Sequence, residues 1–149
     1  MEASTLPNDF KEFLQSLNAE RVEYLLIGGY AVGYYGYPRY TADIDFWIAR
    51  RQDNAERVVK ALKQFGFDMP ENELALFMRE RSVARMGVPP MRIEITNYID
   101  GVQFDECYAR RVVDKIDGVQ VSLISLDDLK TNKRAVGRLK DLADLENLP

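Results

Sequence analysis

Two aspartates separated by one residue lie within an apolar run of the chain. Asp43 and Asp45 alternate there with three hydrophobic residues, namely Ile44, Phe46 and Ile48. In a strand, residues i and i+2 point to the same face, about 6.6 Å apart along the chain. At an effective dielectric of ~20, two negative charges at that separation repel each other by roughly 2.5 kcal/mol. A divalent cation would relieve this repulsion, and carboxylates that hold magnesium can position the phosphates of a nucleotide.

A third carboxylate, that of Glu94, lies in another alternating run. Met91, Ile93 and Ile95 alternate there with polar residues, which predicts a strand with Glu94 in its middle. We expect this strand to lie beside the first, so that Glu94 completes a group of three acids. The alternative is a surface Glu94 that pairs with Arg92 or with a residue on a neighbouring strand.

Other interpretations of the acids also stay open. Thirteen aspartates in 149 residues give about one Asp-x-Asp pair by chance, so this pair could be a solvated strand face. Asp100 and Asp105 are rivals for the third acid, although their surroundings are more typical of loops. The context favours a functional pair, because a glycine turn and a short helical segment precede it.

That glycine turn is Gly28-Gly29, which follows an apolar, β-favouring run over residues 22–27. Backbone N–H groups at a glycine turn that opens a helix can bind an anion, and glycine has no Cβ to keep a phosphate away. Arg39 and Thr41 lie between the turn and the acids. Arg39 could contact phosphates or the acceptor, or be a plain surface residue, and Thr41 could bond the backbone or orient an aspartate, or only form a turn. The turn and the acids suit opposite ends of Mg-triphosphate.

Residues 130–140 carry five basic side chains and no acid: Lys130, Lys133, Arg134, Arg138 and Lys140. Charge runs are usually solvated helix faces. The functional alternative is a patch that covers the triphosphate, in which Lys133 offsets negative charge on the leaving pyrophosphate.

The composition limits the chemistry. The chain has no histidine and a single cysteine, Cys107, which excludes a Cys/His zinc cluster, a Ser-His-Asp triad and an internal disulfide. Catalysis would use carboxylates, Lys, Arg, Tyr or backbone amides with a hard ion such as Mg²⁺. A net charge of −4 gives no bulk attraction to nucleic acid. No apolar run approaches the ~20 residues that span a bilayer, so we predict a cytoplasmic protein with no membrane association.

The length of 149 residues and a hydrophobic fraction of 46% are typical of one globular domain. We predict a single domain over residues 1–149, with its core at about 20–100 and a C-terminal hairpin and helices at about 103–148. Hydrophobic periodicity, caps and turn residues predict the elements. Expected helices cover residues 8–19, 30–35, 54–65, 71–79 and 103–110 and the tail, and expected strands cover 22–27, 43–49, 81–86, 91–96, 111–116 and 119–124.

The first half of the chain resembles a known signature. The stretches Leu26-Ile27-Gly28-Gly29-Tyr30-Ala31 and Gly36-Tyr37-Pro38-Arg39-Tyr40-Thr41-Ala42-Asp43-Ile44-Asp45-Phe46 are similar to the signature of the nucleotidyltransferase superfamily related to DNA polymerase β. Within it, the chain most resembles the small bacterial AbiEii-like nucleotidyltransferases of toxin–antitoxin and phage-defence systems. Ile93-Glu94-Ile95 fits the family's later carboxylate. The basic and acidic pattern from Lys133 to Asp144 is similar to the family's C-terminal region, so the resemblance covers roughly residues 22–148.

The resemblance implies an α/β (α+β) fold of the polymerase-β type, with a short mixed sheet flanked by helices. It implies that Asp43 and Asp45 bind Mg²⁺, that Glu94 completes the metal site or helps to activate the acceptor, and that Gly28-Gly29 holds the triphosphate. The implied enzyme transfers a nucleoside monophosphate from an NTP such as ATP to an acceptor hydroxyl and releases pyrophosphate.

The acceptor stays open between a tRNA end, a protein and a small molecule, and a homodimer or an antitoxin-like partner could complete the site. The alternative function is a non-catalytic antitoxin or regulatory protein that keeps the nucleotidyltransferase fold. A DNA-binding regulator is disfavoured by the charge and by the lack of a helix-turn-helix signal.

Overall fold

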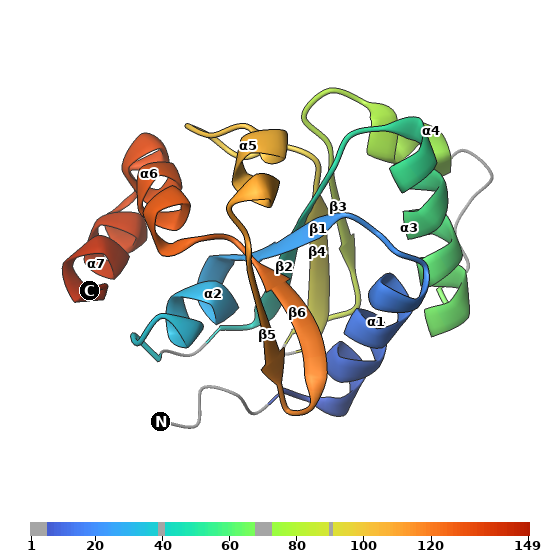
Figure 1. Cartoon of the computed structure of the whole chain (residues 1–149), viewed down its shortest axis with the longest axis horizontal. Helices are drawn as coiled ribbons and strands as arrows, with labels where there is room; N and C mark the ends of the chain where they lie inside the picture. Colours follow the sequence, from blue (N-terminus) through green and yellow to red (C-terminus); the bar gives the residue numbers. More distant parts are fainter. Residues whose placement is uncertain (1–5, 39–40, 68–72, 90) are drawn as a thin grey trace.

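A six-stranded mixed sheet forms the centre of the computed structural model, which describes residues 6–38, 41–67, 73–89 and 91–149 (Figure 1). The strand order is β3-β4-β2-β1-β6-β5. β2 runs parallel to β4, and β1 runs parallel to β6, whereas the other neighbours are antiparallel. The strands are β1 Tyr24–Ile27, β2 Asp43–Ile48, β3 Val83–Met86, β4 Arg92–Thr96, β5 Val112–Ile116 and β6 Val119–Leu123. The predicted α/β fold with a mixed sheet is confirmed.

Helices cover both faces of the sheet. Their bounds are α1 Asn8–Ala19, α2 Gly28–Tyr34, α3 Gln52–Phe65, α4 Glu73–Met78, α5 Phe104–Ala109, α6 Leu126–Val136 and α7 Leu139–Asn147. In Figure 1, α1, α3 and α4 lie on one side of the sheet, and α2, α5, α6 and α7 lie on the other. Every predicted element is present, with ends that differ by a few residues because local patterns fix boundaries less firmly than they fix element type.

The alternation along β2 decides which side carries the acids. Ile44, Phe46 and Ile48 are fully buried in the core beneath α1 and α3. Trp47 belongs to a second core, formed with residues of α2, α5 and α6. Because neighbouring strand residues point to opposite faces, the Asp43 and Asp45 side chains lie on the Trp47 side. The predicted division of faces is confirmed.

Candidate active site

Three carboxylates converge on this second face, at the start of β2 and in the middle of β4. Asp45 lies directly opposite Glu94 in the parallel pairing of these adjacent strands, and Asp43 lies opposite Arg92. One carboxylate oxygen from each of Asp43, Asp45 and Glu94 lies within 4.8 Å of the other two. The three acids line one cavity of about 490 Å³ together with Gly28, Thr41 and residues of α6 and α7. The expected placement of the acids on adjacent strands is therefore found in the fold.

Two of the three carboxylates are paired with arginines. Arg92 donates from Nε to Oδ1 of Asp43 at 2.8 Å and from Nη2 to Oδ2 at 3.1 Å. Arg85, on β3, donates from Nε to Oε2 of Glu94 at 2.8 Å. The pairing of Glu94 with Arg92, one of the alternatives above, is wrong, whereas its pairing with a neighbouring strand is found. Arg85 received no role from the sequence, because only the strand register places it opposite Glu94.

Asp45 differs from the other two acids. It has no hydrogen bond or ion pair with any residue that the structure describes, and its pKa is raised from 3.8 to about 7. Burial is the main cause, and the negative charges of Glu94 and Asp43 add to it. A bound cation would remove this penalty, because it favours the charged carboxylate.

The raised pKa of Asp45 predicts how stability depends on pH. With divalent cations chelated, we expect the wild type to lose roughly 2 kcal/mol of stability relative to Asp45→Asn between pH 5 and pH 8. The folded protein keeps the Asp45 proton up to about pH 7, whereas the unfolded carboxyl, with its pKa of 3.8, has already released it. Stability therefore falls as the pH rises through this window and levels off above it. Urea unfolding of both proteins at several pH values measures the difference; parallel curves would contradict the prediction.

Gly28 permits the close approach of the chain to Asp45. Its φ is +70°, and a Cβ at this position would lie 2.2 Å from Oδ2 of Asp45. A Cβ on the buried Gly29 would lie 2.8 Å from Cβ of Thr41. No side chain of the described residues caps the start of α2, so within this part of the chain its first N–H groups are available to another acceptor. Gly28 thus borders Asp45 and lines the cavity, whereas Gly29 packs against Thr41.

Thr41 forms hydrogen bonds with the backbone of Asp43. Thr41 Oγ1 donates to the backbone carbonyl of Asp43 at 3.0 Å, and the Asp43 N–H points back to Oγ1 at 3.4 Å. Thr41 therefore fixes the backbone that carries the first acid, in agreement with the expected backbone role. Arg39 lies outside the described residues.

Lys133 is not part of a solvated basic face. Its side chain is 6% exposed, and Nζ lies 2.9 Å from Oδ2 of Asp144 and 3.3 Å from Oδ1 of Asp141. Arg138 also pairs with Asp141. Burial alone would raise the pKa of Asp141, but Arg138 and Lys133 together hold it below its ordinary value. Lys133 borders the acid cavity, yet its charge is shared with two carboxylates, Asp141 and Asp144, whose pairing with it the sequence did not predict.

Lys140 is a basic residue of the tail that lies beside the three acids. It lines the acid cavity, it is exposed, and no described residue pairs with it. Its ammonium lowers the pKa of Asp45, against the larger effect of burial. The predicted basic patch therefore includes a buried, ion-paired lysine, Lys133, and an exposed lysine at the acid cavity, Lys140, whereas Arg138 pairs with Asp141.

The donor set fits a hard divalent cation. Three carboxylates supply oxygen ligands, which Mg²⁺ prefers to nitrogen or sulfur. The pKa of Asp45 is raised, so a cation beside it would stabilise its charged form. Gly28 has no Cβ and so leaves space beside the Asp45 carboxylate. The residues present could thus hold a metal ion, with Asp43, Asp45 and Glu94 as its ligands.

Comparison with protein families gives a match over nearly the whole chain. The model of the family described as "Nucleotidyl transferase of unknown function (DUF2204)" matches residues 7–148. The chain belongs to this family. The family and the fold together support a general function in nucleotidyl transfer. Comparison with the curated proteins gives no match.

Solved structures share the fold of this nucleotidyl transferase family member. A candidate nucleotidyltransferase of Thermotoga maritima, TM1012, is similar with a TM-score of 0.62 and 14% identity, over 93% of this chain and 89% of that one. The JHP933 protein of Helicobacter pylori is similar with a TM-score of 0.50 and 18% identity, over 93% of this chain and 62% of that one. Among the described residues, no helix of this nucleotidyl transferase family member has the length and apolar character to cross a membrane.

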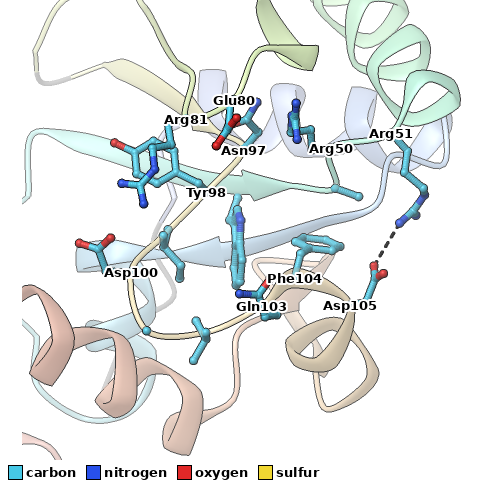
Figure 2. Close-up of a pocket in the computed structure, with 15 residues that line it drawn as sticks. Arg50, Arg51, Glu80, Arg81, Asn97, Tyr98, Asp100, Gln103, Phe104 and Asp105 are labelled. Carbon is cyan, nitrogen blue, oxygen red and sulfur yellow. Dashed lines mark hydrogen bonds and ion pairs between the residues drawn. The ribbon is translucent and has the colours of Figure 1, made fainter.

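A second and larger cavity, of about 770 Å³, adjoins the acid cavity of the nucleotidyl transferase family member (Figure 2). The two cavities share Tyr98, Ile99 and Asp100. Arginines and aromatic rings line it, with the Arg81 guanidinium 5.4 Å from the ring centre of Tyr98. Arg51 donates to Asp105 across its rim. A ligand in this cavity would lie on the same sheet face as the three acids.

Proposed function

We propose that this protein transfers a nucleoside monophosphate from an NTP to an acceptor hydroxyl, with Mg²⁺ as its metal and pyrophosphate as the released product. The observation that carries the proposal is the convergence of Asp43, Asp45 and Glu94 within 4.8 Å, on a sheet face that Gly28 borders. Nucleotidyl transfer is the reaction of the family to which the chain belongs.

The reaction exchanges one bond at the α-phosphorus for another. The acceptor oxygen bonds to the α-phosphorus, the bond from that phosphorus to the bridging oxygen breaks, and pyrophosphate leaves with the bonding electrons. Mg²⁺ held by the three carboxylates would supply positive charge that offsets the negative charge of the phosphates. Glu94 uses only Oε2 for Arg85 among the described residues, so Oε1 is left either to complete the metal site or to accept the proton of the acceptor hydroxyl. Asp43 and Asp45 bind and orient the metal.

The remaining predicted residues act on the nucleotide side of the site. Gly28 and Gly29 present backbone N–H groups to the triphosphate, and Thr41 keeps Asp43 in place. Arg39 remains a proposed phosphate ligand. Lys133 acts through the Asp141 and Asp144 carboxylates that it neutralises, and Lys140 takes the direct contact with phosphate that the sequence assigned to Lys133.

Several finer assignments belong to the proposal as well. The similarity to AbiEii-like enzymes suggests a role in a toxin–antitoxin system, and the composition suggests a cytoplasmic location. We propose that residues 1–149 form one domain and that ATP is among the NTPs used. The acceptor, which could be tRNA, protein or a small molecule, is unassigned, and a homodimer or an antitoxin-like partner would supply any missing acceptor contacts.

Radiolabelled NTPs test the proposed reaction. The protein is incubated with Mg²⁺, a pool of candidate acceptors, and NTPs that carry the label at the α or the γ phosphate. Label that moves from the α position to an acceptor, with pyrophosphate as the co-product, is the expected result. Movement from the γ position alone would make the protein a kinase, and no movement from either would contradict the proposal.

One observation favours the alternative of a non-catalytic protein. Arginines already pair with Asp43 and Glu94, which is how acids are compensated in a site that binds no metal. That alternative predicts no heat of binding when Mg-NTP is titrated into the wild type in a calorimeter. Binding that disappears in Asp43→Asn would exclude it.

A further inference from the structure

The three acids are engaged to different degrees by their neighbours. Both oxygens of Asp43 accept hydrogen bonds from the Arg92 guanidinium, at 2.8 and 3.1 Å. Glu94 uses one oxygen for Arg85, and Asp45 has no partner among the residues described. The difference is built into the sheet, because Asp43 and Arg92 are direct neighbours in the pairing of β2 with β4.

The different pairing of Asp43 and Glu94 affects how each of them can bind a cation. A metal ion bound by Asp43 needs an oxygen that Arg92 also uses, and two positive groups on one carboxylate repel each other. Glu94 can offer its other oxygen and keep Arg85. Cation binding therefore competes with Arg92 and is compatible with Arg85, although the two arginines carry the same charge and line the same cavity.

Arg92 has another partner within reach once the proposed substrate is bound. Its side chain lines the cavity that Gly28 and Lys140 also line, and it is 34% exposed, so it has room to turn. A planar guanidinium binds two oxygens of a phosphate as well as it binds two of a carboxylate.

We propose that Arg92 exchanges partners in the course of substrate binding. It pairs with Asp43 until a divalent cation takes that carboxylate, and it then binds the phosphates of the nucleotide. This inference rests on the proposed function, since it assumes that cation and nucleotide share the acid cavity. Its consequence is coupling: each ligand favours the arrangement of Arg92 that the other needs, so cation and nucleotide strengthen each other's binding.

The competing explanation is a permanent cross-strand pair. Opposite charges directly across two strands stabilise a sheet without any further role. In that case the loss of Arg92 would lower the stability and leave the coupling between cation and nucleotide unchanged.

Mn²⁺ binding distinguishes the two explanations without any turnover. The affinity for Mn²⁺ is measured by electron paramagnetic resonance, with and without an NTP whose α–β bridge is a non-transferable methylene. The four proteins are the wild type, Arg92→Ala, Arg92→Lys and the matched control Arg85→Ala. Direct bonding of Mn²⁺ to the nucleotide is common to all four, so differences between them isolate the arginines. Circular dichroism verifies that each variant is folded.

We expect Arg92→Ala to bind Mn²⁺ alone about tenfold more tightly than the wild type, and its enhancement by nucleotide to fall by about tenfold, within the usual range of coupling between sites. Arg92→Lys keeps the charge but cannot span both oxygens, so it should lie closer to Arg92→Ala than to the wild type. Arg85→Ala should change either value by less than about threefold. A purely structural role of Arg92 would not make the variant bind Mn²⁺ alone more tightly while it reduces the enhancement of Mn²⁺ binding by nucleotide.

Two outcomes would contradict the inference, and they differ in what else they affect. Unchanged Mn²⁺ affinity and coupling in both Arg92 variants would overturn the exchange of partners and leave the proposed function standing. Failure of all four folded proteins to bind Mn²⁺, even with nucleotide, would overturn the metal site itself and the proposed function with it.

Discussion

Replacement of Asp45 by asparagine is expected to lower nucleotidyl transfer by at least about 10³-fold, because metal-assisted phosphoryl chemistry depends on the charge that binds the metal. The substitution is nearly isosteric, so the turn at Gly28 keeps its close contact. The same variant should be more stable than the wild type at pH 8 when metal is chelated, since the neutral amide avoids the cost of burying a negative charge, which raises the pKa of Asp45 to about 7. Transfer of α-label and urea unfolding measure the two effects.

The combination of lost activity with gained stability is the informative result. Asp127→Asn is a suitable control, because Asp127 is an exposed aspartate outside both cavities. It should retain activity and change stability by less than about 0.5 kcal/mol. An Asp45→Asn protein that transfers label at the wild-type rate would remove Asp45 from the site.

Replacement of Lys133 by alanine is expected to cost about 3–5 kcal/mol of folding free energy, which is typical when one partner of a buried ion pair is removed. Asp141 and Asp144, whose side chains are 1% and 2% exposed, would lose the ammonium that they share. Arg134→Ala is the control, because Arg134 is the next residue of the same helix and is exposed. Chemical denaturation of the two variants and the wild type gives the difference.

The lysine prediction separates the two roles considered for this residue. If Lys133 is a phosphate ligand, its replacement by alanine would weaken nucleotide binding and leave the stability nearly unchanged. If Lys133 is a structural residue, the same replacement would mainly lower the stability. If Lys133→Ala proves as stable as Arg134→Ala and loses nucleotide affinity, the ion pairs described here are not what fixes α7 against α6.

The glycine turn gives a further test of the site's geometry. Gly28→Ala should destabilise the protein by at least about 2 kcal/mol, because φ of +70° disfavours a side chain and the new Cβ would overlap Asp45. Gly33→Ala is the matched control in the same helix, where an added Cβ meets nothing within 4 Å. It should stabilise the protein by about 0.5–1 kcal/mol. Thermal melting of both variants decides; equal effects would contradict the close contact.

The arrangement of the acids could be predicted because it depends on short-range patterns. Alternation alone places Asp43 and Asp45 on one strand face, and the same alternation places Glu94 on another strand. The signature of the family then suggests that the two strands are neighbours. These features need only the period of a strand and a few residues of context.

The environment of the acids could not be predicted in the same way. The pairing of Arg92 with Asp43 follows from the register between strands nearly fifty residues apart, which no local pattern contains. The burial of Lys133 depends on α7 folding back onto α6, so a run that looks like a solvated basic face becomes the centre of an ion-pair cluster.

The cluster around Lys133 makes one wall of the site depend on the last helix of the chain. Asp141 and Asp144 both come from α7, and Lys130 donates a hydrogen bond to the carbonyl of Pro149. Proteolytic trimming before residue 141 would leave an unpaired Lys133 ammonium beside the three carboxylates of the acid cavity.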